Sequence, residues 1–102
     1  DMWISFYCIA ASYSPEFYQS AIDFFKTVQY VLPTEETRNL FSHLVEQYPI
    51  EPYLNSNHDL FFWVYLMNDA YCKKLGCVID SDYTLWKSFI FKSLGDDCKQ
   101  CQ

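Results

Sequence analysis

The stretch "SNHDLFFWVYLMNDAYCKKLG", residues 56–76, decides the fold. Ser56 precedes a long apolar segment and Asp59 follows three residues later, a variant of the capping box that begins helices. Apolar side chains then recur at three- and four-residue steps, as they do on one face of an α-helix. These are Leu60, Phe61, Val64, Met67, Tyr71 and Leu75. Gly76 suits a helix end because glycine adopts the left-handed conformation easily. The stretch therefore predicts one long helix with a local signal at each end.

The same reasoning, extended outward, predicts an all-α protein. Four further helices are expected: residues 1–13, a segment from Pro15 to Pro33, a segment capped by Thr34 that ends before Pro49, and a shorter one from Asp80 or Asp82 to Gly95. No long period-two alternation occurs, and the chain has only two glycines, which excludes glycine-rich phosphate loops. We predict a four-helix bundle over residues 1–95 with a short fifth helix across one end, followed by a polar tail, residues 96–102.

Charge and hydropathy narrow the classes of partner. The net charge is −6 and no basic stripe is present, so neither nucleic acid nor an anionic membrane is expected as a partner. The longest apolar runs are about half of the ~20 residues that a membrane-spanning helix needs. The N-terminus lacks the basic start and cleavage site of a signal peptide, and it begins with Asp1 rather than Met, as a processed or excised segment would. These features predict a soluble domain and leave its compartment undefined.

Four islands of sequence resemble the Erv/ALR family of flavin-linked sulfhydryl oxidases. They occur in the family's order and at similar spacing: "WISFYCIAASYSPE" (3–16), "VLPTEETRNLF" (31–41), "PIEPYLNSNHDLFFWV" (49–64) and "NDAYCKKLG" (68–76). The resemblance implies an Erv/ALR-like helical bundle. Divergent members of the family occur in large DNA viruses, so a viral source would fit.

The differences from the family pattern fall on its reactive positions. The family carries a Cys-x-x-Cys at a helix N-terminus beside the flavin, where the helix terminus favours the thiolate. Thr34 and Thr37 stand at those two positions here. A hydroxyl can form no disulfide, so the resemblance implies a kept fold and a lost thiol oxidase reaction. Read without the family, Thr34 is a plain helix cap. The substitution could be natural or engineered.

The resemblance also indicates which residues would contact FAD if the cofactor is retained. The family's first histidine corresponds to Tyr7 and its second to Asn68, and two following asparagines correspond to Asp69 and Cys72. The full set of FAD-contact candidates is Trp3, Tyr7, Tyr13, Asn68, Asp69, Cys72 and Lys74. An uncompensated carboxylate at Asp69 would repel the phosphates of FAD. We therefore expect no cofactor, with FAD as the one candidate, and no metal.

The five cysteines leave two readings open. Cys98 and Cys101 form a Cys-x-x-Cys in the polar tail, which is either a mobile shuttle dithiol of the kind that some family members carry or an incidental tail. An odd cysteine count leaves at least one thiol free. Cys72 and Cys77 are five residues apart and are predicted to face different sides of a helix end, so no bridge between them is expected.

Two functions follow from these observations. The first is an Erv/ALR-like domain without oxidase activity, a structural or protein-interaction module. It would pair as a homodimer or with an active oxidase relative through an aromatic face around Phe17, Tyr18 and Phe25, or serve as the inactive half of a longer oxidase. The alternative is an active FAD-dependent thiol oxidase whose entry point is the dithiol of Cys98 and Cys101. An unrelated helical bundle is the third possibility.

Overall fold

The computed structural model describes residues 2–77 and 82–101, with side chains as far as residue 94. Every regular element in this part of the chain is a helix. The elements are α1 (Met2–Ala11), η1 (Pro15–Phe17), α2 (Tyr18–Val31), α3 (Glu35–Gln47), η2 (Glu51–Tyr53), α4 (Asn57–Leu75) and α5 (Tyr83–Cys101), where η marks a 3-10 helix. The prediction of an all-α fold is confirmed.

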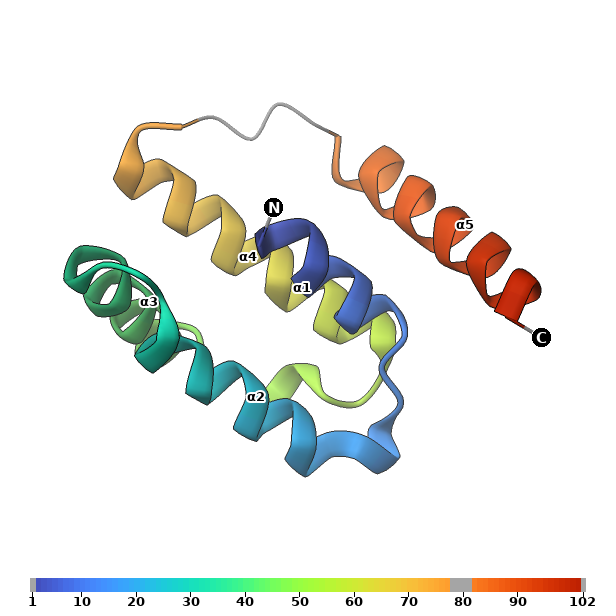
Figure 1. The fold of residues 1–102 in the computed structure, drawn as a ribbon, viewed down its shortest axis with the longest axis horizontal. Coiled ribbons are helices and arrows are strands. Elements are labelled where there is room, and N and C mark those ends of the chain that lie inside the picture. The colour runs from blue at the N-terminus through green and yellow to red at the C-terminus, as the bar shows by residue number, and fades with distance from the viewer. Residues whose placement is uncertain (1, 78–81, 102) are drawn as a thin grey trace.

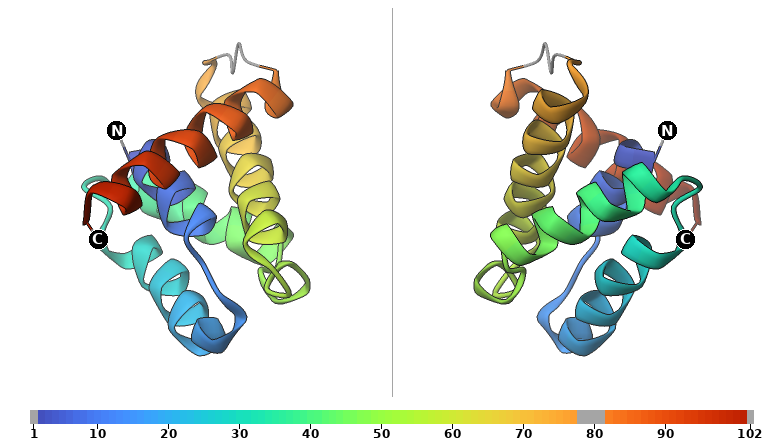
Figure 2. Two further views of the ribbon diagram at one scale, coloured as in Figure 1. Left: turned by 90° about the vertical axis from the view of Figure 1, so that its right-hand side faces the viewer. Right: turned by 90° about the vertical axis from the view of Figure 1, so that its left-hand side faces the viewer.

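The helices pack as two neighbouring pairs with α5 added at one side. Helix α1 lies along α4, and α2 packs against α3 (Figure 1). Both views in Figure 2 show α5 on the side of α1 that is turned away from α3. The molecule measures 41 × 31 × 24 Å. In the described part of the chain, none of the helices combines the length and the apolar character that crossing a bilayer requires.

The core is built around Trp63 of α4, whose side chain is 1% exposed. Its ring meets Phe25 of α2 edge to face at 5.0 Å. The indole Nε1–H donates to the backbone carbonyl of Tyr48 at 2.8 Å, which satisfies the only polar group of the side chain. Full burial of a side chain of this size stabilises the fold by roughly 2–3 kcal/mol. Trp63 thus joins α4, α2 and the end of α3 at one point.

The local signals at the ends of α4 act as predicted. The Ser56 side chain accepts a hydrogen bond from the backbone N–H of Asp59 at 3.1 Å. At the other end Gly76 has φ +80°, the left-handed conformation that glycine adopts without strain. Single residues, Ser56 and Gly76, therefore predicted both boundaries of α4.

Two long-range hydrogen bonds position the end of α1. Asn57, in the first turn of α4, donates through Nδ2 to the carbonyl of Ala11 at 2.9 Å. The Tyr13 hydroxyl donates to the carbonyl of Leu54 at 2.8 Å. The first helix was predicted to run to Tyr13 but ends at Ala11. The chain turns there because the Ala11 carbonyl bonds to α4 and the Tyr13 hydroxyl bonds to the connector before α4.

Helix α5 departs from the prediction in length and position. Asp82 caps it by accepting the backbone N–H groups of Thr84 and Leu85 at 2.8 and 3.2 Å, whereas Asp80 lies outside the described residues. The helix has 19 residues, the same number as α4, and does not end at Gly95. A glycine inside a helix costs only about 1 kcal/mol, so a helix can continue through it.

The contacts of α5 show that it lies beside the bundle rather than across one end. Its Trp86 meets Tyr7 of α1 edge to face at 5.6 Å, and its Phe91 stacks on His58 at the start of α4 at 5.0 Å. Tyr83 packs against Tyr65 in the middle of α4 at 4.8 Å. Helix α5 therefore packs on α1 and crosses α4 obliquely (Figure 2), and its aromatic side chains reach the N-terminal half of α4.

Candidate functional site

The Thr-x-x-Thr pair forms a closed cap at the start of α3. The Thr34 hydroxyl accepts the backbone N–H of Thr37 at 3.1 Å, and the Thr37 hydroxyl lies 3.4 Å from the backbone N of Thr34, which donates to it. The two hydroxyl oxygens are 2.8 Å apart. These bonds make a reciprocal capping box, in which threonine takes the place of the usual Glu or Gln. The hydroxyls are thus engaged with each other and with the backbone.

Arg38 holds the same turn against the end of α2. Its Nη1 donates to the carbonyl of Leu32 at 2.7 Å, and this carbonyl belongs to the residue that follows α2. Because a charged donor makes a stronger hydrogen bond than a neutral one, the Arg38 bond fixes where α3 begins. The arginine is a positioning residue that the sequence reasoning did not single out.

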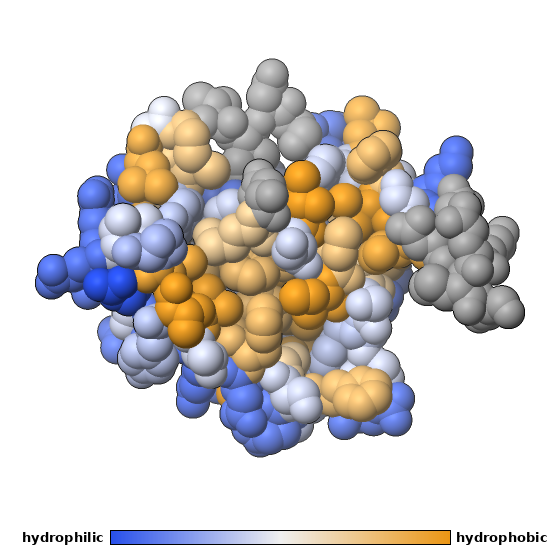
Figure 3. All heavy atoms as spheres, in the orientation of Figure 1, coloured by the Kyte–Doolittle hydropathy of each residue, from blue (hydrophilic) through white to orange (hydrophobic). Residues whose placement is uncertain are grey.

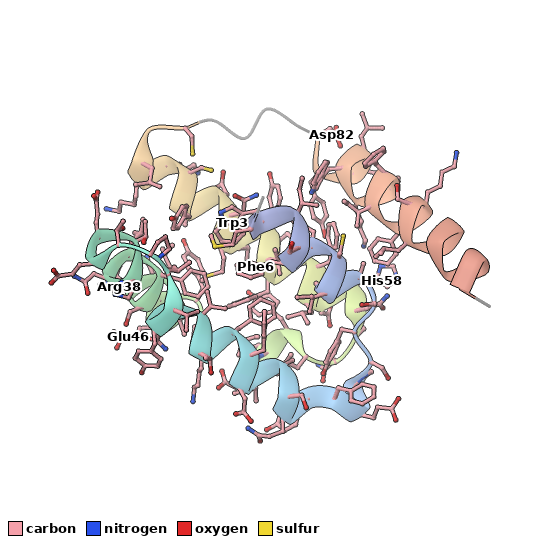
Figure 4. The ribbon with its side chains drawn as sticks, viewed as in Figure 1. Trp3, Phe6, Arg38, Glu46, His58 and Asp82 are labelled. Carbon is pink, nitrogen blue, oxygen red and sulfur yellow. The ribbon has the colours of Figure 1, made fainter. Side chains whose placement is uncertain are left out.

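An aromatic cluster lies behind this turn. Trp3 of α1 meets Tyr71 of α4 at 5.4 Å and Phe41 of α3 at 6.4 Å between ring centroids. Figure 4 shows Trp3 and its neighbour Phe6 near the centre of the molecule, where these helices converge. Burial raises the pKa of Tyr71, and nearby charges that include Glu36 raise it further. The start of α3 therefore faces a packed aromatic layer.

A hydrogen-bonded chain joins α1 to α4 at the two positions that the resemblance aligned with histidines of the Erv/ALR pattern. Asn68 donates through Nδ2 to the Tyr7 hydroxyl at 3.1 Å, and the Cys72 thiol donates to Asn68 Oδ1 at 3.6 Å. The structure thus brings together three of the residues that the resemblance placed in one site. The Tyr7 side chain is only 1% exposed and is covered by Phe61 and Trp86.

The Tyr7 hydroxyl and the Cys72 thiol are both held in their protonated forms near neutral pH. Burial raises the pKa of Tyr7 to about 12, a shift that the hydrogen bond from Asn68 partly opposes. Burial likewise raises the pKa of the Cys72 thiol to about 11, and a hydrogen bond with the Cys77 side chain adds to this shift. A thiol is nucleophilic only as the thiolate. Near neutral pH, Cys72 is therefore a poor nucleophile.

The remaining predicted contacts on α4 are near solvent. Asp69 pairs with Lys73 one turn away at 2.8 Å, where the Lys73 ammonium neutralises the carboxylate that was expected to repel a phosphate. The Lys73 pKa is raised by its hydrogen bond to Asp69. Lys74 is exposed. These side chains form the outer edge of α4.

Two pockets of 240 Å³ each are hollowed into the described surface. One lies between α2, α3 and the connector, and is lined by Ile22, Phe25, Lys26, Val45, Glu46, Pro49, Ile50, Glu51 and Trp63. The other, which we call the α1–α2 groove, is lined by Ile9, Tyr13, Phe17, Ser20, Ala21, Phe24 and Leu60. Both are smaller than the 300–1,000 Å³ of typical cofactor sites.

The residues predicted for FAD do not fit that group as they stand. Of the seven, only Tyr13 lines either pocket, and its hydroxyl is already bonded to Leu54. Tyr7 and Asn68 bond to each other under the cover of Trp86. The expectation of no cofactor, with FAD as the one candidate, stays a prediction. Among the described residues, no three His, Cys, Asp or Glu side chains gather as a metal site.

The cysteines divide into two groups. The side chains of Cys98 and Cys101 lie outside the described residues, so the shuttle hypothesis stays a prediction. Cys8, Cys72 and Cys77 are free thiols. The expectation that Cys72 and Cys77 face different sides is wrong, because the left-handed Gly76 turns the chain back and the Cys77 thiol reaches the carbonyl of Cys72 at 3.4 Å.

The aromatic face proposed for pairing is only partly at the surface. Phe25 is buried at 1% exposure and belongs to the core, where it packs against Trp63. Phe17 and Tyr18 are exposed, at 57% and 48%, and Phe24 joins them at 41%. The exposed part of the predicted face therefore lies at the α1–α2 groove, which Phe17 and Phe24 line.

Comparisons with known proteins do not add an identification. No family model, no curated protein and no solved structure matches this chain. The fold and the site thus define an all-α protein in which Tyr7, Asn68 and Cys72 form a partly buried hydrogen-bonded chain between α1 and α4. The likeness to Erv/ALR oxidases stays a prediction that depends on four short motifs.

Proposed function

We propose that this chain is an Erv/ALR-like helical module without thiol oxidase activity, which binds another copy of itself through the α1–α2 groove. The observation that carries the proposal is the groove. All of its lining residues are uncharged, and Ile9, Phe17 and Phe24 are each more than 40% exposed. Adjacent exposed apolar side chains of this kind mark interaction sites.

The capping box at α3 supports the loss of redox chemistry. Both hydroxyls of the Thr34–Thr37 pair are used in holding the helix start, and neither can carry electrons as a disulfide does. Figure 3 supports the binding role, because hydrophobic residues gather across the middle of the face that carries α1. The capping box and the hydrophobic surface together favour an interaction role over catalysis.

The net charge of −6 gives the pairing a recognisable salt dependence. Two copies repel each other electrostatically, while the apolar contact is little affected by moderate salt. We therefore expect the dimer to tighten as the salt concentration rises. An interface built on ion pairs would weaken instead.

The first test is the oligomeric state of the native protein, measured by light scattering after gel filtration. The wild type should be a dimer, and Phe17→Ser should shift it toward monomer. Phe89→Ser is the matched control, because Phe89 is exposed to a similar extent, 62% against 57% for Phe17, but lies on α5, outside the groove. A wild-type protein that stays monomeric at high concentration, or a Phe89→Ser variant that dissociates as readily, contradicts the proposed surface.

The second test is the visible spectrum of the same preparation. A colourless, folded protein agrees with the non-catalytic module. A yellow protein with flavin absorbance supports the alternative, an FAD-dependent thiol oxidase that takes electrons through Cys98 and Cys101. Peroxide production that requires a dithiol and is lost in Cys98→Ser would decide for the oxidase.

A further inference from the structure

The C-terminus of α4 has the geometry of a Schellman motif with a cysteine at each contact position. Gly76 takes the left-handed conformation, and the backbone N–H of Cys77 donates to the carbonyl of Cys72 at 2.9 Å. This bond closes six residues and is characteristic of the motif. The motif commonly brings the side chains of its first and sixth residues into contact, usually as an apolar pair. In this chain both are thiols.

The side chains show that the contact is made. The Cys77 thiol donates to the carbonyl of Cys72 at 3.4 Å, so it points back over the last turn of α4. The neighbouring Cys77 side chain also contributes to raising the pKa of Cys72, after burial. Cys77 is exposed and Cys72 is half-buried, and both are free.

We propose that Cys72 and Cys77 are a modification site: they form a reversible disulfide that locks the C-terminus of α4, by exchange with small-molecule disulfides. This inference does not depend on the proposed function, because it needs neither a flavin nor a partner. It uses only the local geometry of the helix end. A disulfide requires that the two Cα atoms lie close and that the Cβ vectors converge, and the Schellman turn brings both residues together.

The exchange takes place in two displacements. The Cys77 thiolate attacks one sulfur of the small disulfide, whose S–S bond breaks, and the first small thiol leaves as a thiolate with the bonding electron pair. Cys72 then loses its proton to solvent and attacks the Cys77 sulfur, which releases the second small thiol. Two protein thiols lose two protons and two electrons, and the small disulfide is reduced to two thiols.

The order of these steps follows from exposure. Cys77 meets solvent, whereas burial holds Cys72 protonated until high pH. Cys77 is therefore the entry residue and Cys72 the resolving residue. We expect ring closure, rather than the first attack, to accelerate most as the pH rises, because only the thiolate attacks.

Oxidation of Cys72 would also affect the contact between α4 and α1. The Cys72 S–H donates to Asn68 Oδ1 at 3.6 Å, and Asn68 in turn donates to Tyr7 on α1 at 3.1 Å. The disulfide removes that S–H donor and leaves the amide oxygen of Asn68 without this bond. The redox state of the α4 terminus is thus linked through one side chain to the contact between α1 and α4.

The test uses the full chain, reduced, desalted and equilibrated in buffers of varied reduced and oxidised glutathione. Remaining thiols are alkylated, and tryptic peptides are analysed by mass spectrometry. Cleavage after Lys73 and Lys74 separates Cys72 from Cys77, and all five cysteines fall in different tryptic peptides. Each possible pair is therefore distinguishable. We expect the Cys72–Cys77 cross-link to appear as a two-electron transition, with little glutathione left on Cys77.

A matched pair of variants tests whether the turn is responsible. Gly76→Ala keeps both thiols but strains the left-handed residue, and should lower the equilibrium constant for the cross-link by up to about tenfold. Gly76→Asn should lower it less, because asparagine tolerates this conformation. Persistent glutathione on Cys77 without ring closure would overturn the proposal. So would preferential pairing with Cys98 or Cys101, or an unchanged equilibrium in Gly76→Ala.

Discussion

Two helix ends in this protein hold a pair of short polar side chains each, and they use them differently. At the start of α3, Thr34 and Thr37 are three residues apart, and their hydroxyls complete a cap with the backbone. At the end of α4, Cys72 and Cys77 are five residues apart, and a glycine turn brings the Cys77 thiol to the Cys72 carbonyl. The two threonine hydroxyls are engaged in hydrogen bonds of the cap, whereas the two cysteines are free thiols, for which we propose a reversible disulfide.

The comparison teaches that spacing alone does not define a redox pair. The three-residue spacing at α3 is the one that redox proteins use, yet its residues are hydroxyls that bond to each other. The five-residue spacing at α4 looks unsuitable on a straight helix. It becomes suitable because the helix ends between the two cysteines, at the left-handed Gly76.

Alkaline pH should cause the largest loss of stability, and it should come from Tyr7, the α1 residue that accepts a hydrogen bond from Asn68 of α4. The pKa of Tyr7, raised to about 12 by burial, exceeds that of an unfolded tyrosine near 10. Stability from this group is fully present below pH 10 and is lost as the pH rises through 12, up to about 2–3 kcal/mol. Denaturant titrations at pH 7 and in steps above pH 9 measure the loss.

The control for the alkaline loss is Tyr7→Phe, which removes the titrating hydroxyl. Its stability should fall less steeply between pH 10 and 12 than that of the wild type. The Cys72 thiol, with its pKa raised to about 11, contributes a decline that starts about one pH unit lower and remains in this variant. Identical profiles of stability against pH for the two proteins would show that Tyr7 does not cause the alkaline loss.

The second largest effect is expected at Gly76. A Cβ added there meets no atom within 4 Å, so the effect of Gly76→Ala comes from the backbone alone. The left-handed conformation costs an L-residue roughly 1–2 kcal/mol, and the free energy of unfolding should fall by up to that amount. Gly76→Asn should lose less. Equal losses in the two variants would indicate that the left-handed φ is not what the site requires.

The smallest effect is expected at the α3 cap. Thr34→Ala removes the acceptor for the backbone N–H of Thr37 and should lower the free energy of unfolding by about 1 kcal/mol. Thr34→Ser keeps the hydroxyl and is the matched control. Unlike the alkaline loss from Tyr7, this one should be the same at pH 7 and pH 11. A Thr34→Ala variant as stable as the wild type would mean that the cap contributes nothing.

The parts of the fold that were predictable are those encoded locally. Ser56, Thr34 and Asp82 each mark a helix start because a short polar side chain accepts a nearby backbone N–H. Gly76 marks an end because of its conformation. None of these signals needs knowledge of the rest of the chain, so the sequence placed them directly, except that it left Asp80 and Asp82 as alternatives for the start of α5.

The parts that were missed depend on contacts between distant residues. Gly95 was expected to end α5, but a helix end is decided by packing as well as by propensity, and α5 continues to Cys101. Phe17 and Phe25 look alike in sequence, yet one is exposed and the other is in the core. The cover of Trp86 over Tyr7 joins residues far apart in the chain and has no local signal.

The candidate site was predictable in the same partial way. The resemblance placed Tyr7, Asn68 and Cys72 in one site, and they do share hydrogen bonds. It gave no indication that the α1–α2 groove would be the open surface. The approach of Cys77 to Cys72 did have a signal in the sequence. A glycine stands directly before Cys77, and glycine at that position of a helix end is typical of a Schellman motif.

The bond from Asn57 to the carbonyl of Ala11 has a consequence for the order of assembly. The two residues are 46 positions apart, so α1 receives this partner only after α2 and α3 have been synthesised. The α2–α3 hairpin, with its short connection, closes a much smaller loop and can pair sooner. We therefore expect α1 to become fixed after the α2–α3 pair has formed, although α1 is synthesised before both helices.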